Sequence, residues 1–143
     1  METWLKRFEK YLNDKGLRHS RPRNLVAQEF FRSDGHVGIE SLYKRVHRIN
    51  PKVGIATVYR TLNLLVESDL AVKRDFLTGV PTYERMPEVH HDHLLCTQCG
   101  DIIEFHQDQI EKLQDLVAKK YRFHLDFHKM ELYGRCHKCF RNS

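Results

Sequence analysis

The sequence predicts an α+β protein in which a winged helix-turn-helix domain precedes a small α/β domain with an antiparallel sheet. The first observation is a series of amphipathic helical segments that ends in a hairpin pattern. The second is that all four cysteines and seven of the ten histidines follow residue 86. The third is charge: residues 1–86 carry 16 Lys and Arg against 10 Asp and Glu, whereas residues 87–143 carry 8 against 9. We therefore expect a basic partner-binding domain followed by a metal-binding one.

With 143 residues, the chain is long enough for two small domains and too short for a large enzyme. The composition, 41% hydrophobic and 30% charged, is that of a folded protein. We place the domains at 1–85 and 91–143, with a hinge at 86–90. No apolar run approaches the length of a membrane span, and Met1–Arg7 lacks the apolar core of a signal peptide. The expected location is therefore the bacterial cytoplasm, without membrane association.

Four amphipathic helices are expected in the first domain, at 4–15, 21–33, 39–49 and 55–68. Ser20 is suited to cap the second helix. In the fourth, 100° per residue places the apolar side chains on one buried stripe, formed by Ile55, Val58, Leu62, Leu65 and Val66. Ala56, Arg60 and Asn63 lie on the opposite side, with Tyr59 on the flank. A Tyr and an Arg are thus offered outward early in this helix.

A hairpin is expected after the fourth helix, with strands at 70–75 and 80–84 and a turn at Leu77-Thr78-Gly79. Helices, an outward Tyr-Arg pair and a two-stranded hairpin together make a winged helix-turn-helix. The alternative reading is any small helical domain that ends in a hairpin.

The second domain is expected to contain two antiparallel strands, 94–96 and 102–105, on either side of a CxxCG turn. A helix should span 108–120, with Ile110, Leu113, Leu116 and Val117 facing inward. A further strand is expected at 123–133. Its apolar residues fall on both parities, which is typical of a strand that is covered on both faces, for instance by a second subunit.

Two CxxC pairs, Cys96 with Cys99 and Cys136 with Cys139, are the strongest local signal for a metal. Four thiolates close off a zinc ion tetrahedrally, so this set predicts a structural zinc site. Two disulfides or a redox-active pair are the alternatives. The reducing cytosol and the absence of a βαβ pattern count against both of them.

The segment His90-His91-Asp92-His93 holds three histidines and a carboxylate within four residues. If it is extended, His91 and His93 point to one side while His90 and Asp92 point to the other, so the segment would serve two sites. Iron, manganese, cobalt and zinc all accept imidazole and carboxylate. Candidates to complete the first site are His36, Glu84 and Glu104. For the second, Glu111 and His128 are available, although His106 and His124 would serve nearly as well. A merely polar loop is the alternative.

These residues resemble the ferric uptake regulator superfamily of bacterial metal-responsive repressors over almost the whole chain. The matching motifs are GIATVYRTL at 54–62, HHDHL at 90–94, CTQCG at 96–100, IEF at 103–105 and LYGRC at 132–136. The resemblance implies a homodimer, with a tetramer left open. It also implies a winged-helix domain hinged to an α/β dimerisation domain, a double-stranded A/T-rich inverted-repeat operator as partner, and no small organic substrate.

The resemblance also assigns residues. It implies structural Zn²⁺ on Cys96, Cys99, Cys136 and Cys139, a regulatory site on His36, Glu84, His91, His93 and Glu104, and an additional site on His90, Asp92, Glu111 and His128. It places Thr57, Tyr59 and Arg60 at the operator, with Arg18 in the minor groove. Peroxide-sensing relatives usually carry Asp in place of Glu104, so Glu104 favours Fe²⁺ as corepressor. Zinc-, manganese-, nickel- and peroxide-responsive members of the same family remain alternatives, and Mn²⁺ or Zn²⁺ could occupy the regulatory site in vitro.

Two other function classes compete. His91, His93 and Glu104 match the two-histidine, one-carboxylate triad of small non-haem iron enzymes. However, the second domain has only the 57 residues from 87 to 143, which leave little room for a substrate pocket. A zinc-stabilised adaptor for protein partners would have no evident use for the outward Tyr59 and Arg60. We therefore expect a DNA-binding regulator that is not an enzyme.

Overall fold

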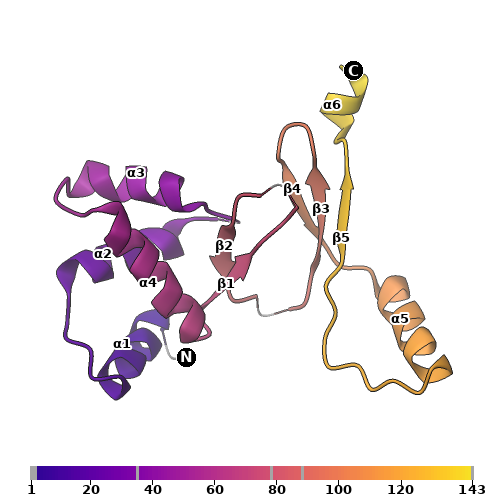
Figure 1. Ribbon diagram of the computed structural model, residues 1–143, viewed down its shortest axis with the longest axis horizontal. Coiled ribbons are helices and arrows are strands. Elements are labelled where there is room, and N and C mark those ends of the chain that lie inside the picture. Colours follow the sequence, from indigo (N-terminus) through magenta and orange to yellow (C-terminus); the bar gives the residue numbers. More distant parts are fainter. Residues whose placement is uncertain (1–2, 35, 78, 88, 143) are drawn as a thin grey trace. The chain divides into compact units, whose positions relative to one another are not determined.

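The computed structural model describes residues 3–34, 36–77, 79–87 and 89–142. The chain divides into two compact units, unit 1 at Met1–Met86 and unit 2 at Pro87–Ser143 (Figure 1). Parts of the expected turn at 77–79 and of the expected hinge at 86–90 lie outside the described residues. In the described part of the chain, no helix has both the length and the apolar character needed to cross a membrane.

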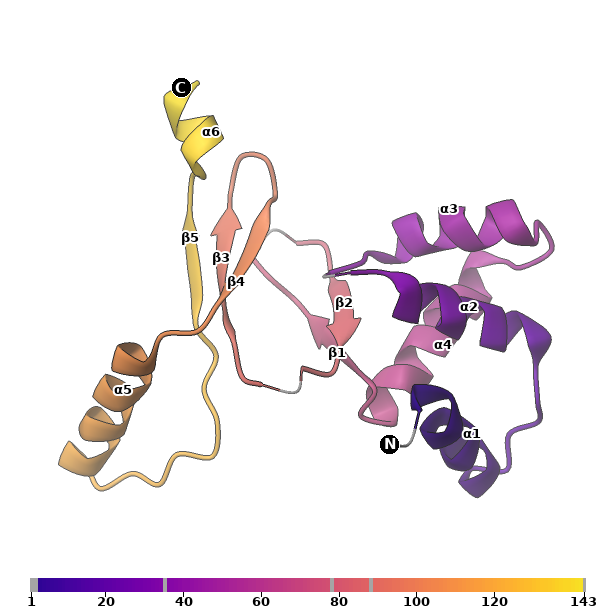
Figure 2. The ribbon, with the colours of Figure 1, turned by 180° about the vertical axis from the view of Figure 1, so that it is seen from behind.

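Unit 1 contains the helices and the hairpin that the sequence predicts. The elements are α1 (Trp4–Asp14), α2 (Arg21–Arg32), α3 (Ile39–Ile49), α4 (Ile55–Glu67), β1 (Ala71–Arg74) and β2 (Thr82–Arg85); Figure 2 shows them from behind. The predicted cap is confirmed, because the Ser20 hydroxyl accepts a hydrogen bond from the Arg23 amide at 3.3 Å. Thr3 caps α1 in the same way at 3.5 Å. These caps satisfy amides that a helix leaves without an internal partner.

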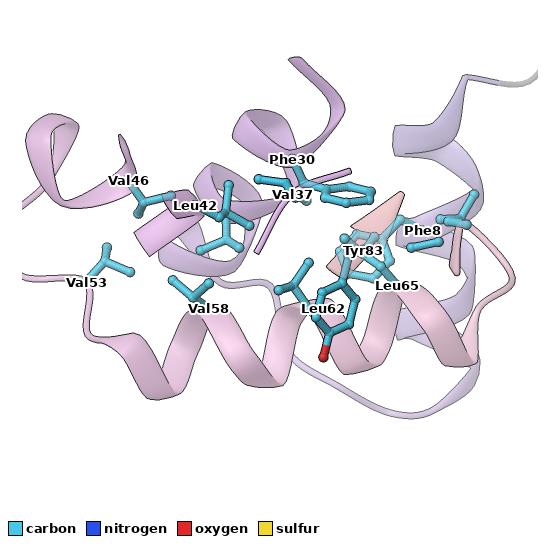
Figure 3. Close-up of a cluster of buried hydrophobic side chains, with 14 of the residues drawn as sticks. Phe8, Phe30, Val37, Leu42, Val46, Val53, Val58, Leu62, Leu65 and Tyr83 are labelled. Atoms are coloured by element: carbon cyan, nitrogen blue, oxygen red, sulfur yellow. The ribbon is translucent and has the colours of Figure 1, made fainter. Parts of the chain in front are cut away.

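The core of unit 1 forms where α1, α2, α3 and α4 meet the hairpin (Figure 3). Val58, Leu62 and Leu65 on α4 are fully buried, as the helical stripe predicts, and Tyr83 of β2 packs into the same core. Ile55 was also expected in the stripe, but it is 48% exposed. It is the first residue of α4, and side chains of a helix lean toward its N-terminus, so Ile55 projects beyond the helix end.

The connector before α3 is hydrogen-bonded to the hairpin. The Val37 amide donates to the Tyr83 carbonyl, and the Tyr83 amide donates to the Val37 carbonyl, both at 2.8 Å. This pair forms an antiparallel bridge, so the residues beside it, His36 and Glu84, are opposite each other. A second contact holds the start of the connector, because Arg85 donates to the Ser33 carbonyl at 3.1 Å.

Unit 2 is a three-stranded sheet with two helices. Its elements are β3 (Asp92–Cys96), β4 (Ile102–Phe105), α5 (Asp108–Lys120), β5 (Glu131–Gly134) and α6 (His137–Arg141). The strand order is β4-β3-β5. β3 and β4 are antiparallel, as predicted, whereas β5 pairs parallel to β3, so the sheet is mixed. α5 and α6 lie near opposite ends of the sheet (Figures 1 and 2). The sequence did not predict α6.

Two predictions for unit 2 were wrong. The strand expected at 123–133 is regular only at 131–134, because β3 begins at Asp92 and pairs with β5 only from Glu131 onward. The face of α5 expected to point inward is exposed in the single chain, since Leu113 and Leu116 are each 61% exposed and Val117 is 58% exposed. α5 lies near the end of the sheet, so the sheet does not cover this face (Figure 1). It borders an open apolar groove of about 640 Å³.

Candidate metal centres

The four cysteines converge in unit 2, and all four are free thiols. Their sulfur atoms all lie within 4.8 Å of one another. The sulfurs of Cys99 and Cys136 are 3.8 Å apart. Four sulfurs bound to one zinc ion at about 2.3 Å are separated by roughly 3.8 Å, the edge of the tetrahedron. This geometry fits a tetrahedral zinc site and excludes disulfides within the set in this structure.

Hydrogen bonds from backbone amides stabilise a thiolate in this cluster, which favours binding of a cation. The amides of Cys99 and Cys136 donate to the Cys96 sulfur at 3.4 Å and 3.3 Å. These hydrogen bonds lower the pKa of Cys96 to about 6, so its thiolate prevails at neutral pH. The pKa of Cys139 is raised to about 12, and the main cause is a hydrogen bond between its thiol and the Cys136 sulfur. Four thiolates at this spacing repel one another, so a bound cation is needed to hold them together as anions.

A second cluster joins β3, α5 and the segment before β5. The Nε2 atoms of His90 and His128 are 2.8 Å apart, and they lie 3.1 Å and 3.2 Å from Asp92 Oδ1. Glu111 Oε1 lies 3.4 Å from His128 Nε2. Asp92 is only 1% exposed. Ligands about 2.1 Å from one ion are spaced by roughly these distances, so the four side chains fit a divalent metal.

Of the candidates for this second cluster, Glu111 and His128 are the ones that lie close to His90 and Asp92. His106 is instead hydrogen-bonded to Asp108 at 2.8 Å. That contact raises the pKa of His106 above its usual value. Spacing along the sequence did not distinguish these histidines, because their distance from Asp92 depends on how the chain folds before and after α5.

The segment 90–93 carries a further set of candidate ligands on its other side. His93 is directly opposite Glu104 in the β3–β4 ladder, so both side chains lie on one face of the sheet. His91 Nε2 lies 3.7 Å from Glu104 Oε1, and the rings of His91 and His93 are 4.8 Å apart. The alternation expected at 90–93 is therefore present. Two imidazoles and a carboxylate are ligand types that suit a transition metal, so these side chains are three candidate ligands.

Unit 1 has its own pair of candidate ligands, His36 and Glu84. Nε2 of His36 lies 3.3 Å from Oε2 of Glu84, and both side chains are more than nine-tenths buried. The ring of His36 packs edge-on against buried Phe76 at 5.9 Å between centroids. On the other carboxylate oxygen, Arg74 Nε donates to Glu84 Oε1 at 2.9 Å. Sequence reasoning missed Arg74, because its proximity to Glu84 depends on the register of the hairpin.

The residues expected at DNA lie on the exposed side of unit 1. Arg60 and Tyr59 are exposed on α4, and Arg18 is exposed in the segment between α1 and α2. Thr57 and Arg60 line a groove of about 490 Å³ together with Ser20 and Arg23. Arg23 also donates to the Arg18 carbonyl at 2.8 Å, which ties this basic segment to α2. The groove thus lies between α4 and the basic segment, with guanidinium groups available for an anionic partner.

Known proteins resemble this chain over most of its length. The profile of the Ferric uptake regulator family matches residues 14–133. The Ferric uptake regulation protein of Campylobacter jejuni is 43% identical over 140 residues, which cover 96% of this chain and 89% of the relative. The structure of the ferric uptake regulator of Helicobacter pylori, described as revealing three functional metal-binding sites, superimposes with a TM-score of 0.90. The two chains are 32% identical, and the match covers 95% of this chain and 91% of the Helicobacter pylori chain. A zinc-bound manganese uptake regulator is 36% identical, with a TM-score of 0.72, over 90% of this chain and 98% of its own.

We predict that Cys136→Ser lowers zinc binding at the cysteine cluster by at least about a hundredfold, because it removes one of four ligands. Because the sequence has only four cysteines, thiol titration reports this cluster alone. In the zinc-loaded wild type we expect the thiols to react slowly until a strong chelator is added, and in the variant to react at once. His137→Ala, next to the ligand, is the control. Equal thiol reactivity with and without zinc would contradict the assignment.

We predict that His128→Ala removes one equivalent of bound divalent metal beyond the zinc. His124→Ala provides a matched control, because His124 lies on the same exposed segment outside the cluster. Equilibrium dialysis of the zinc-loaded protein with Co²⁺ measures the stoichiometry. The assignment fails if the two variants bind the same amount of Co²⁺.

Proposed function

The chain belongs to the ferric uptake regulator family of transcriptional regulators, which are not enzymes, and we propose that it represses iron-uptake genes when Fe²⁺ is bound. Regulators of this family bind DNA and form dimers. The single observation that carries the proposal is the presence of two incomplete ligand sets, one on each unit. His36 and Glu84 belong to unit 1, and His91, His93 and Glu104 belong to unit 2.

In our proposal these two sets bind one regulatory ion. Iron takes five or six ligands, more than the described residues of either set offer. Only one relative orientation of the two units can satisfy all five side chains, so the ion binds that orientation more tightly and shifts the population toward it. A shift from a mostly open to a mostly closed ensemble requires about 5 kcal/mol of differential affinity, which several ligand bonds can supply. The segment 86–90 is the hinge of this movement.

Closing the hinge would set the spacing of two recognition helices in a dimer. A dimer meets operator half-sites related by a two-fold axis, so α4 of each protomer must lie in successive major grooves at a fixed separation. In this arrangement the Arg60 guanidinium pairs with guanine, Tyr59 contacts thymine methyl groups, and Thr57 contacts the operator beside them. Arg18 enters an A/T-rich minor groove, where the negative potential is strongest.

The other two clusters have separate tasks in this proposal. Zinc on the four cysteines is structural and ties the C-terminal segment to β3. The site of His90, Asp92, Glu111 and His128 binds an additional metal within unit 2. The three functional metal-binding sites of the Helicobacter pylori regulator support this division of three sites on one chain. A cytoplasmic location in a bacterium and association of dimers into a tetramer belong to the same proposal.

Iron is the proposed effector for two reasons. The Campylobacter jejuni relative, which shares 43% of residues, is a ferric uptake regulation protein. Glu104 also favours the iron-responsive branch, since peroxide-sensing members of the family usually carry Asp there. Manganese is the second candidate, because a zinc-bound manganese uptake regulator is 36% identical to this chain. Both candidates bind through the same five side chains, so only a measurement with each ion separates them.

The deciding experiment measures operator binding at buffered free concentrations of Fe²⁺, Mn²⁺, Zn²⁺ and Ni²⁺ under anaerobic conditions. The operator is first selected from a random duplex library with the zinc-loaded protein and Fe²⁺. We expect Fe²⁺ to tighten operator binding by at least about a hundredfold. Of the four ions, Fe²⁺ should reach this effect at the free concentration that is lowest relative to its concentration in the cell. If no metal changes binding by even about tenfold, roughly 1.4 kcal/mol, the corepressor function is wrong.

We predict that Arg60→Ala weakens operator binding by about tenfold to a hundredfold, because a guanidinium-to-guanine pair contributes roughly 1–3 kcal/mol. His93→Ala should instead weaken metal binding and leave non-specific DNA affinity unchanged. Arg141→Ala, which removes the same charge from unit 2, is the control for net charge. Fluorescence anisotropy and metal titration on the same samples measure both affinities. Equal losses of DNA and metal affinity in Arg60→Ala would contradict this division of labour.

A further inference from the structure

We propose that Arg74 sets the metal concentration at which the protein responds, because its positive charge opposes binding of a divalent ion by Glu84. The inference rests on the proposed regulatory role of His36 and Glu84, and it concerns side chains of unit 1 only. Arg74 is neither a metal ligand nor one of the residues proposed to contact DNA. It acts through the carboxylate that it shares with the ion.

The hairpin register brings Arg74 to Glu84. Arg74 pairs with Thr82 and Val72 pairs with Glu84 in the β1–β2 ladder. Arg74 and Glu84 are therefore diagonal neighbours on the same face of the hairpin. The resulting contact is direct, since Arg74 Nε donates to Glu84 Oε1 at 2.9 Å.

The two oxygens of the Glu84 carboxylate have different neighbours. Oε1 accepts from Arg74, whereas Oε2 lies 3.3 Å from Nε2 of His36. His36 is held opposite Glu84 by the two hydrogen bonds between Val37 and Tyr83, so this arrangement does not depend on Arg74 for its backbone geometry. Arg74 therefore contributes mainly a charge and one hydrogen bond to a ligand pair that is already in position.

Burial strengthens the effect of that charge. The side chains of Glu84, His36 and Arg74 are 4%, 7% and 17% exposed, and Phe76 covers the imidazole. Water therefore screens this guanidinium less than it screens a surface arginine. A guanidinium also stays protonated at every physiological pH, so the opposing charge is permanent.

The sign of the effect follows from Coulomb's law. An ion bound by Glu84 and the guanidinium on the same carboxylate would be roughly 6 Å apart, and their repulsion corresponds to about tenfold in affinity even at the dielectric constant of water. Without the ion, Arg74 is the counter-charge that makes a buried carboxylate tolerable. Arg74 therefore stabilises the metal-free state relative to the metal-bound state. A sensor gains from this, because an ion bound too tightly would not be released when the metal becomes scarce.

The test compares Arg74→Gln with Arg74→Lys by Co²⁺ titration of the zinc-loaded dimer. Both proteins carry His128→Ala, so that the additional site does not contribute. Glutamine retains a hydrogen-bond donor and removes the charge, whereas lysine retains the charge. Lys73→Gln is the matched control, because Lys73 lies one residue away on the opposite face of the hairpin and is exposed. Circular dichroism and thermal unfolding confirm that each variant is folded.

We expect Arg74→Gln to bind Co²⁺ at least about tenfold more tightly, while Arg74→Lys and Lys73→Gln stay within about twofold of the parent protein. The metal concentration for half-maximal operator binding should fall in the same proportion. Unchanged or weaker Co²⁺ binding in Arg74→Gln overturns the proposal. So does a similar gain in Lys73→Gln, since it would reflect net charge alone.

Glu84→Gln separates this inference from the function on which it rests. If Glu84→Gln weakens Co²⁺ binding but Arg74→Gln does not strengthen it, the role of Arg74 is wrong and the regulatory site stands. If Glu84→Gln leaves Co²⁺ binding unchanged, Glu84 is not a ligand. In that case both the five-residue site and the role of Arg74 are overturned.

Discussion

Alternation of side chains along β3 is the constraint on which the metal chemistry of unit 2 depends. Asp92 points to the cluster with His90 and His128, and the next residue, His93, points to the other face with Glu104. The last residue of the strand, Cys96, provides a sulfur of the cysteine cluster. A shift of the strand by one residue would exchange the two faces and remove ligands from all three sets. The hydrogen bonds to β4 and β5 on either side of β3 fix this register.

The parallel pairing of β5 explains how distant cysteines come together. β5 runs beside β3 in the same direction, so its end at Gly134 is paired with Cys96. The Thr97 amide also donates to the Gly134 carbonyl at 2.7 Å, which places Cys136 within reach of the first CxxC turn. A strand of opposite direction would have carried the second pair to the far end of the sheet. A metal bound by the four cysteines would continue the attachment of β5 to β3 beyond the point where the backbone ladder ends.

Local patterns in the sequence predicted most of unit 1 and part of unit 2. The helices, the cap at Ser20 and the alternation at 90–93 follow from interactions within a few residues, so spacing is enough to predict them. Misses occurred where distant partners decide. The segment 123–129 has β-like composition but lies beyond the start of β3, whose ladder with β5 begins at Glu131, and Arg74 meets Glu84 only through the hairpin register. The ligand set of the additional cluster depended on the family resemblance, because by spacing His106 and His124 would have served nearly as well as His128.

The exposed apolar face of α5 links the folding of this chain to its own abundance. Leu113, Leu116 and Val117 gain a dry environment only when another apolar surface covers them. If a second copy supplies that surface, the population of dimers at low concentration rises with the square of the protomer concentration. A cell that halves its supply of the regulator then loses more than half of the DNA-binding form. Under the proposed function, synthesis of the chain would be a second input to repression, and it would act even when the supply of metal is constant.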